Sequence, residues 1–189
     1  MATSVRFTSK DLEAFPDNTK RYEIIDGELY VSKNPALPHQ HVCMVLAAEL
    51  HIWSVRTGAG FVYPTPGLVF AEDDDVIPDI VWVSKERLPL IVDDHGHFKA
   101  APELIVEVLS PGAANQSRDR DAKLKLYSRQ GVREYWIADA VLHAVSVYRR
   151  EEAALHLART LGDGEMLTSP LLPGFACRVE TLWMPTLGS

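Results

Sequence analysis

Runs of apolar residues along the chain predict a β-sheet that is covered on both sides. Residues 104–109 read Leu-Ile-Val-Glu-Val-Leu and residues 80–83 read Ile-Val-Trp-Val, so apolar side chains stand at consecutive positions. That pattern is typical of strands buried on both faces. Two further strand-like runs, 22–25 and 28–31, flank Asp26-Gly27, a dipeptide that favours a tight turn with two positive φ angles. The chain should therefore contain an early hairpin and, later, buried central strands.

Helical spacing predicts two substantial helices. Within residues 39–55 the apolar side chains recur every three or four positions, at Val42, Leu46, Leu50 and Trp53. A second helix is expected from Ser117, a capping residue, to just before Gly131, which suits the left-handed position after a helix. Shorter expected elements are a helix near 8–15, strands at 61–63, 67–70, 134–139 and 144–149, a hairpin in the tail, and a solvated loop at the acidic cluster 72–75. The fold class is therefore mixed α/β (α+β), with a covered central sheet.

Composition narrows the class of protein. The chain has 189 residues, 47% of them hydrophobic and 24% charged, which predicts one domain over residues 1–189. The net charge of −7 excludes a protein that coats nucleic acid by bulk charge, although it permits a local basic patch. The two cysteines are too few for a disulfide framework and indicate a reducing compartment. No apolar run is long enough to span a bilayer, and residues 1–7 lack the apolar core of a secretory signal, so we expect a cytoplasmic protein without a membrane partner.

Two carboxylates stand at positions where burial would make an ionised carboxylate energetically unfavourable. Glu107 interrupts an apolar strand, and Asp79 follows Pro78 at the mouth of another. An ionised carboxylate buried in such a place needs a cation or several hydrogen-bond donors. Glu107 could instead reach solvent at a strand end or pair with an arginine, and Asp79 could simply form a turn. If the two converge from adjacent strands, they make an oxygen-only site that suits Mg²⁺ or Mn²⁺ better than zinc.

The expected helix after residue 117 is locally basic. Residues 117–133 hold six basic side chains and two acidic ones, against the negative balance of the whole chain. Asp119, Lys123 and Tyr127 recur every four positions and share one face. One interpretation is an ion pair on a solvated surface helix. The other is that Lys123 points at the carboxylates, because its helix begins shortly after the strand that carries Glu107.

These residues, in this order, resemble the PD-(D/E)XK nuclease superfamily, and most closely its Uma-two family of endonucleases. The resemblance extends over nearly the whole chain, and its pieces are specific in combination rather than singly. It is carried by Tyr-Glu-Ile-Ile-Asp-Gly-Glu-Leu at 22–29, His-Gln at 39–40, Ile-Pro-Asp-Ile at 77–80, Glu-Leu-Ile-Val-Glu-Val-Leu-Ser-Pro at 103–111, Arg-Asp at 118–119, Lys123, Tyr127 and Gly-Val-Arg-Glu-Tyr-Trp-Ile at 131–137.

The resemblance implies a restriction-endonuclease-like fold, a mixed central sheet flanked by helices with added hairpins. It also implies that Asp79 and Glu107 bind the metal and that the backbone carbonyl of Val108 completes its shell. The superfamily lysine should stand at position 109, which is Leu here; in the Uma-two family it has moved to the following helix, where Lys123 matches. Glu23 matches an early glutamate that binds a second metal or water. His39 and Asp119 match recurrent positions without an assigned role.

The sequence therefore predicts a Mg²⁺- or Mn²⁺-dependent endonuclease that hydrolyses DNA. Asp79, Glu107, Lys123 and Glu23 would form the catalytic set. Arg118, Arg120 and Arg129 would contact backbone phosphates, which supply affinity without base preference. Fold analogy adds a homodimer, since nucleases that cut both strands often pair two sites. The alternatives are a non-catalytic binding module on the nuclease fold and a hydrolase of some other phosphate ester.

Overall fold

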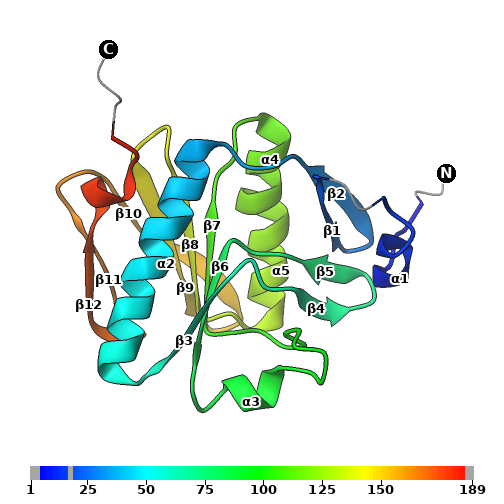
Figure 1. Ribbon diagram of the computed structural model, residues 1–189, viewed down its shortest axis with the longest axis horizontal. Helices are drawn as coiled ribbons and strands as arrows, with labels where there is room; N and C mark the ends of the chain where they lie inside the picture. Colours follow the sequence, from blue (N-terminus) through cyan, green and yellow to red (C-terminus); the bar gives the residue numbers. More distant parts are fainter. Residues whose placement is uncertain (1–4, 17–18, 186–189) are drawn as a thin grey trace.

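The computed structural model describes residues 5–16 and 19–185 (Figure 1). Residues 1–4, part of the segment read as lacking a secretory signal, lie outside the described residues. The helical elements are α1 (Ser9–Leu12), α2 (Leu37–Thr57), α3 (Leu88–Ile91), α4 (Ala113–Ser117), the π-helical turn η1 (Arg118–Ala122), α5 (Lys123–Gln130) and the 3₁₀ turn η2 (Val179–Leu182). Within the described part of the chain, no helix combines the length and apolar character needed to cross a bilayer.

Three sheets make up the β-structure. A six-stranded sheet has the order β10-β9-β8-β7-β6-β3, a four-stranded sheet has the order β2-β1-β5-β4, and β11 pairs with β12. Among the strand pairs of the described residues, β7 and β8 pair in parallel and the others are antiparallel. The strands are β1 (Arg21–Ile25), β2 (Glu28–Ser32), β3 (Gly60–Pro64), β4 (Leu68–Ala71), β5 (Asp74–Val76), β6 (Ile80–Ser84), β7 (Leu104–Val108), β8 (Glu134–Asp139), β9 (Ala144–Glu151), β10 (Ala154–Leu161), β11 (Met166–Ser169) and β12 (Leu172–Arg178).

The six-stranded sheet carries a core on each face, which explains its consecutive apolar residues. On one face Val106 packs with α2 and the β11–β12 hairpin. On the other face Ile105 packs with α5 and with strands β4 and β5 of the four-stranded sheet. Helices α2 and α5 accordingly lie on opposite sides of this sheet in Figure 1. Burial of apolar side chains on both faces is the main force that holds such a layered arrangement together. The mixed sheet flanked by helices confirms the predicted fold class.

Local turn chemistry explains the best-predicted elements. Asp26 and Gly27 have φ of 51° and 74°, the two positive angles expected of the turn between β1 and β2. Helix α2 begins two residues earlier than expected, with Pro38 in its first turn, where a missing N–H costs nothing. Gly131 ends α5 in the left-handed conformation at φ 90°, as predicted.

Two expectations about local structure were wrong. The cluster 72–75 is not simply a solvated loop, because Asp74 and Asp75 begin strand β5. Asp74 is buried there and accepts a hydrogen bond from the backbone N–H of Asp26 at 2.9 Å. This partner compensates the burial of a carboxylate that an acidic run in the sequence suggests is exposed to solvent. The basic helix begins at Ala113 rather than at Ser117, whose side chain caps nothing, and it passes through a π-helical turn before α5.

Gly60 tests the packing between β3 and β6. A methyl group at this position would press against the carbonyl oxygen of Val83 and the indole of Trp82. We expect Gly60→Ala to lower the free energy of unfolding by about 1–3 kcal/mol, measured by urea denaturation. Gly162→Ala is the matched control, because its new methyl would meet only the carbonyl oxygen of His143 at 4.0 Å. Equal stability of the two variants would contradict the packing at this strand pair.

Candidate active site

The two predicted carboxylates come from neighbouring antiparallel strands. Ile80 of β6 faces Val106 of β7, so Asp79, just before β6, lies close to the end of β7 that carries Glu107. The backbone N–H of Val108 donates to Oδ2 of Asp79 at 2.9 Å, which ties the two strand ends together. Both carboxylates are buried, with exposed fractions of 3% for Asp79 and 1% for Glu107. The structure therefore rules out the solvent-facing alternative for Glu107.

The side chain of Lys123 has no exposed surface and its ammonium reaches Glu107. Its Nζ is 2.8 Å from Oε1 of Glu107 and 2.7 Å from Oε1 of Glu23. The hydroxyl of Tyr127 also donates to Oε1 of Glu107, at 2.9 Å. Asp119 is one helical turn before Lys123 and lies 3.9 Å from its Nζ. The surface-helix interpretation of this face is thus excluded, and the lysine joins the carboxylates as the resemblance implied.

Glu23 is held from three directions. It comes from β1, it is fully buried, and its Oε1 accepts the backbone N–H of Ile77 at 2.9 Å as well as the bond from Lys123. Among the described residues no hydrogen bond reaches its Oε2, whose nearest cation is Nη1 of Arg118 at 3.5 Å. The ammonium of Lys123 lies between Glu23 and Glu107, so an ion bridging these two carboxylates would have to displace it.

Asp79 has two cationic or polar partners that sequence reasoning did not connect with it. Nη1 of Arg21 lies 3.0 Å from Oδ1, and Nε2 of His39 lies 3.1 Å from Oδ2. His39 belonged to the resemblance without a role, and Arg21 was not considered. A signal existed for His39, because it opens the long helix whose apolar face packs on the central sheet. No local pattern pointed to Arg21, because its contact with Asp79 spans 58 positions.

Burial and neighbouring charges lower the pKa of two of the buried carboxyl groups and raise the pKa of the third. Burial alone would raise the pKa of Asp79, but the hydrogen bond from His39 and the charge of Arg21 hold it well below its usual range. The pKa of Glu23 is likewise lowered, because Lys123 and Arg118 outweigh its burial. Burial raises the pKa of Glu107 to about 8, only partly opposed by Lys123. Although burial disfavours its charge, Lys123 has a raised pKa because Glu107 and Glu23 face it, so its ammonium stays charged.

The donor set fits a hard divalent cation. Asp79 and Glu107 offer carboxylate oxygens from adjoining strand ends, and Val108 offers a backbone carbonyl next to Glu107. A nearby cation would compensate the burial that keeps Glu107 from ionising. Oε2 of Glu23 is a further buried oxygen without a hydrogen bond. The residues present are therefore compatible with Mg²⁺ or Mn²⁺, as their resemblance implies.

The three predicted phosphate-binding arginines already have acidic partners. Arg118 is buried and makes two bonds to the carboxylate of Asp119, at 2.8 and 3.1 Å. Arg120 pairs with Asp139 at 3.1 Å, and Arg129 pairs with Asp74 at 2.9 Å and with Asp26 at 3.0 Å. Arg120 and Arg129 keep part of their side chains exposed, at 35% and 46%. These two can reach a ligand by exchanging partners, whereas Arg118 lies inside the network.

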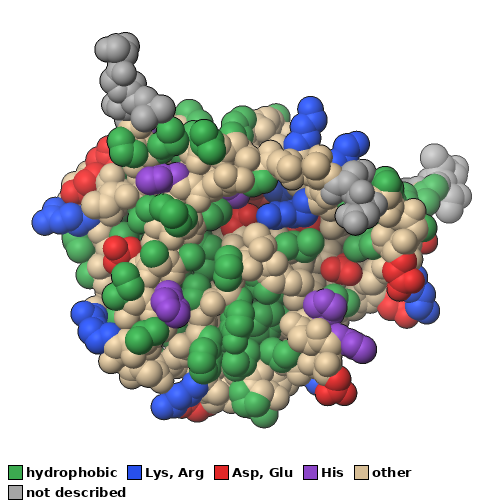
Figure 2. All heavy atoms as spheres, in the orientation of Figure 1, with side chains coloured by type: hydrophobic (Ala, Val, Ile, Leu, Met, Phe, Trp, Pro, Cys, Tyr) green, Lys and Arg blue, Asp and Glu red, His purple; other side chains and the backbone are tan. Residues whose placement is uncertain are grey.

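Asp79 is reached from a surface groove. Arg21, His39 and Asp79 line a narrow opening together with Lys33 and Ser110. It continues into a groove of about 390 Å³ between the segment after β2 and the turn after β7, residues 31–36 and 110–115. Figure 2 shows acidic and basic side chains meeting in a hollow between α2 and the β1–β2 hairpin. The exposed Lys33 on this rim was not a candidate from the sequence.

The raised pKa of Glu107 predicts a pH-dependent stability of the metal-free protein. Between the ordinary carboxyl pKa and about 8, folded Glu107 holds a proton that the unfolded chain has released, so its contribution favours unfolding as pH rises. Glu107→Gln cannot titrate. Its unfolding free energy relative to the wild type should therefore grow from about pH 5.5 to about pH 7.5, by up to about 1.4 kcal/mol per pH unit. Denaturation in chelator at several pH values measures this, and a difference that does not vary with pH would refute it.

Comparison with known proteins identifies the family and the fold of the chain. The family model of Uma2, described as "Putative restriction endonuclease", matches residues 9–180. A crystal structure described as a "putative nuclease" from Anabaena variabilis ATCC 29413 is similar, with a TM-score of 0.72 and 17% identity over 93% of this chain and 97% of that one. At such low identity the likeness shows the fold, and no curated protein matches the chain. Because the family model covers most of its length, the chain belongs to the Uma2 (Uma-two) family of restriction-endonuclease-like proteins.

Proposed function

We propose that the protein is a Mg²⁺- or Mn²⁺-dependent endonuclease that hydrolyses phosphodiester bonds in DNA. The observation that carries this proposal is that Asp79 and Glu107 lie at adjoining strand ends of the central sheet and that the buried Lys123 pairs with Glu107. Membership of a nuclease family supports the same conclusion. The proposal covers the identity of the ion, the DNA substrate and the roles of the individual residues.

The charges of the site suit the hydrolysis of an anionic ester. A divalent cation held by Asp79 and Glu107 would neutralise the charge of the scissile phosphate and lower the pKa of the attacking water. Asp79 is already ionised, and Arg21, His39 and the N–H of Val108 hold its two oxygens, so that binding the ion would loosen one of these contacts. Glu107 would release its proton when the ion binds.

Lys123 would act as a cation rather than as a base. Its raised pKa keeps it protonated at neutral pH, so it cannot accept the proton of a water molecule. An ammonium fixed by Glu23 and Glu107 can donate a hydrogen bond to a phosphate oxygen or to the nucleophile, and such preorganised charge stabilises the transition state. Glu23 would then serve by positioning Lys123.

The groove beside Asp79 is the proposed path of the DNA backbone. Polar and apolar residues line it together, the exposed Lys33 among them, and it adjoins the narrow opening that Asp79 lines. Phosphate contacts are proposed for the partly exposed Arg120 and Arg129, and for Arg118, which is largely buried but lines the narrow opening beside Asp79. A homodimer would bring two such grooves to one duplex. The cytoplasm is the proposed location.

One observation favours a second candidate, a nuclease-fold module that binds without turnover. The cations around the site are already paired with acids, so that the network is closed in the absence of any ligand. The net charge of −7 also opposes tight binding of DNA. A binding module would retain nucleic-acid affinity but would show no metal-dependent cleavage.

Cleavage assays separate the two candidates. With Mg²⁺ or Mn²⁺ and varied DNA, we expect Asp79→Asn and Lys123→Met each to lower the cleavage rate by at least about 100-fold, because each removes charge that the transition state needs. Lys125→Met is the matched control, an exposed lysine two positions along the same helix. Circular dichroism checks that the variants fold. Wild-type cleavage that both variants retain would defeat the assignment, and a wild type that binds DNA without cutting would favour the binding module.

Salt dependence tests the groove. Lys33→Glu should weaken DNA binding at all sequences alike and should lower the slope of log affinity against log salt by about 1, because one phosphate contact is lost. Binding would be measured on the Asp79→Asn background by fluorescence anisotropy. Lys85→Glu is the control, since Lys85 is also exposed but follows the end of β6 that lies away from Asp79. A larger loss with Lys85→Glu than with Lys33→Glu would place the DNA elsewhere.

A further inference from the structure

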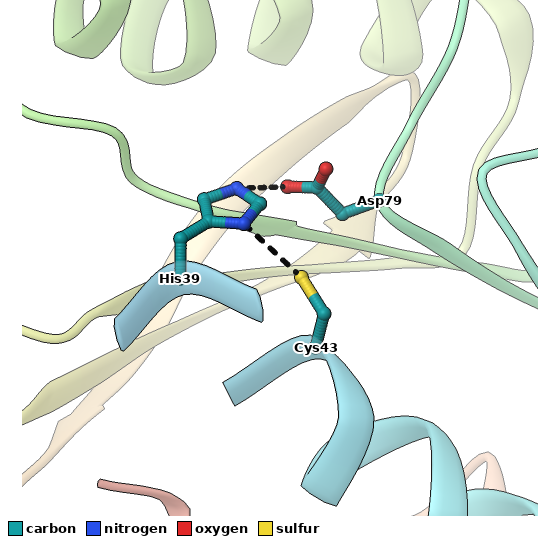
Figure 3. A group of neighbouring side chains, drawn as sticks. All are labelled: His39, Cys43 and Asp79. Carbon is teal, nitrogen blue, oxygen red and sulfur yellow. Dashed lines mark hydrogen bonds and ion pairs between the residues drawn. The ribbon is translucent and has the colours of Figure 1, made fainter. Parts of the chain in front are cut away.

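Helix α2 carries a histidine and a cysteine one turn apart beside Asp79 (Figure 3). His39 Nδ1 lies 3.5 Å from Sγ of Cys43, and His39 Nε2 lies 3.1 Å from Oδ2 of Asp79. One potential ligand atom from each residue falls within 4.8 Å of those of the other two. In the chemistry proposed above His39 only orients Asp79 and Cys43 takes no part, so the pairing of His39 with Cys43 is unexplained.

The distance between the two donor atoms fits a tetrahedral metal ion. A zinc ion bound by imidazole nitrogen at about 2.0–2.1 Å and by thiolate sulfur at about 2.3 Å holds these atoms about 3.5 Å apart at the tetrahedral angle. The separation of Nδ1 and Sγ is 3.5 Å. His39 and Cys43 are separated by four positions in a long helix, so the backbone fixes them on one face. The pair thus has the spacing of a two-residue clamp before any ion arrives.

Asp79 sets the tautomer that metal binding requires. Oδ2 of Asp79 also accepts the backbone N–H of Val108, so it acts as an acceptor and Nε2 of His39 carries the proton in this contact. In the neutral ring Nδ1 then has a free lone pair, and it faces Sγ of Cys43. A carboxylate that accepts from the far nitrogen of a metal-binding histidine is the usual support of zinc sites.

We propose that His39 Nδ1 and Cys43 Sγ bind one thiophilic divalent cation of the Zn²⁺ class, oriented by Asp79. Imidazole and thiolate are soft or borderline donors that select zinc over Mg²⁺, in contrast to the all-oxygen set of Asp79 and Glu107. Water fills the remaining positions through the narrow opening lined by His39 and Asp79. Burial keeps Cys43 protonated in the free protein, and binding releases that proton to solvent.

The proposed oxygen-only site and the proposed site of His39 and Cys43 share Asp79, so an ion bound at one affects the other. While Asp79 accepts from a zinc-bound His39, it is held in that contact and less free to ligate Mg²⁺. Zinc would therefore inhibit the cleavage proposed above. This consequence rests on the proposed function, whereas the binding of the ion does not.

Cobalt spectroscopy tests the binding directly. Co²⁺ is the probe, added to metal-free wild-type protein; ligation by a thiolate produces a sulfur-to-cobalt charge-transfer band in the near ultraviolet. We expect a saturable band at one ion per chain that Zn²⁺ abolishes by displacing Co²⁺. Cys43→Ser should remove the band and weaken zinc binding by at least about tenfold in calorimetry. Cys177→Ser, at the other cysteine of the chain, is the matched control and should keep both.

The wild-type spectrum keeps the proposal falsifiable even where Cys43→Ser folds poorly. Absence of the band in the wild type at millimolar Co²⁺ would overturn the site, as would a band lost in Cys177→Ser and kept in Cys43→Ser. Mg²⁺-dependent cleavage, if present, should be more sensitive to added zinc in the wild type than in Cys43→Ser. A protein that binds cobalt through Cys43 but cuts no DNA would confirm the site and refute the proposed function, so that the two failures are distinguishable.

Discussion

A lysine side chain with no exposed surface needs its compensation inside the protein, and Lys123 finds it in carboxylates from two separate sheets. Glu23 belongs to the four-stranded sheet and Glu107 to the six-stranded one, and both lie within 2.8 Å of the same ammonium. Removing Glu23, the ionised partner, would cost about 3–5 kcal/mol, because the buried ammonium would be left without a compensating charge. The small sheet, the central sheet and α5 are therefore joined at one charged atom.

This junction also explains why the helix before α5 is irregular. The π-helical turn η1 precedes Lys123 and contains Asp119, which is fully buried and lies between Arg118 and Lys123. A π-helical turn contains one residue more than an α-helical turn and so rotates the side chains that follow it around the helix axis. Such turns occur often at functional sites. A regular helix from Ala113 would place Lys123 about 100° away around the axis. The irregularity thus fits a lysine that reaches the carboxylates from a helix instead of from the strand.

How far the sequence predicts this molecule depends on how local each determinant is. The turn at Asp26-Gly27 and the end of α5 at Gly131 follow from the φ angles of single residues, and both were predicted correctly. Strand β5 was missed because its leading aspartates look solvated until the partners from the β1–β2 turn and α5 are known. The meeting of Lys123 with Glu107 was anticipated through a family resemblance and a short connection between elements. The contact of Arg21 with Asp79 had no such sign, because it depends on how two sheets pack.

Asp79 and Glu107 differ in a way that follows from their neighbours and bears on how an ion would bind. Asp79 is ionised without any ion, because Arg21, His39 and the N–H of Val108 stabilise its charge. Glu107 shares its cation with Glu23 and is crowded by the negative charges of Asp79 and Asp119, so its proton is retained near neutral pH. The first contact of an incoming cation is thus electrostatically favourable at Asp79, whereas the contact at Glu107 requires release of a proton. Binding of an ion at the proposed oxygen-only site would consequently be coupled to the charge of the whole network around Lys123, whereas a soft ion at the proposed site of His39 and Cys43 would contact only the Asp79 side of it.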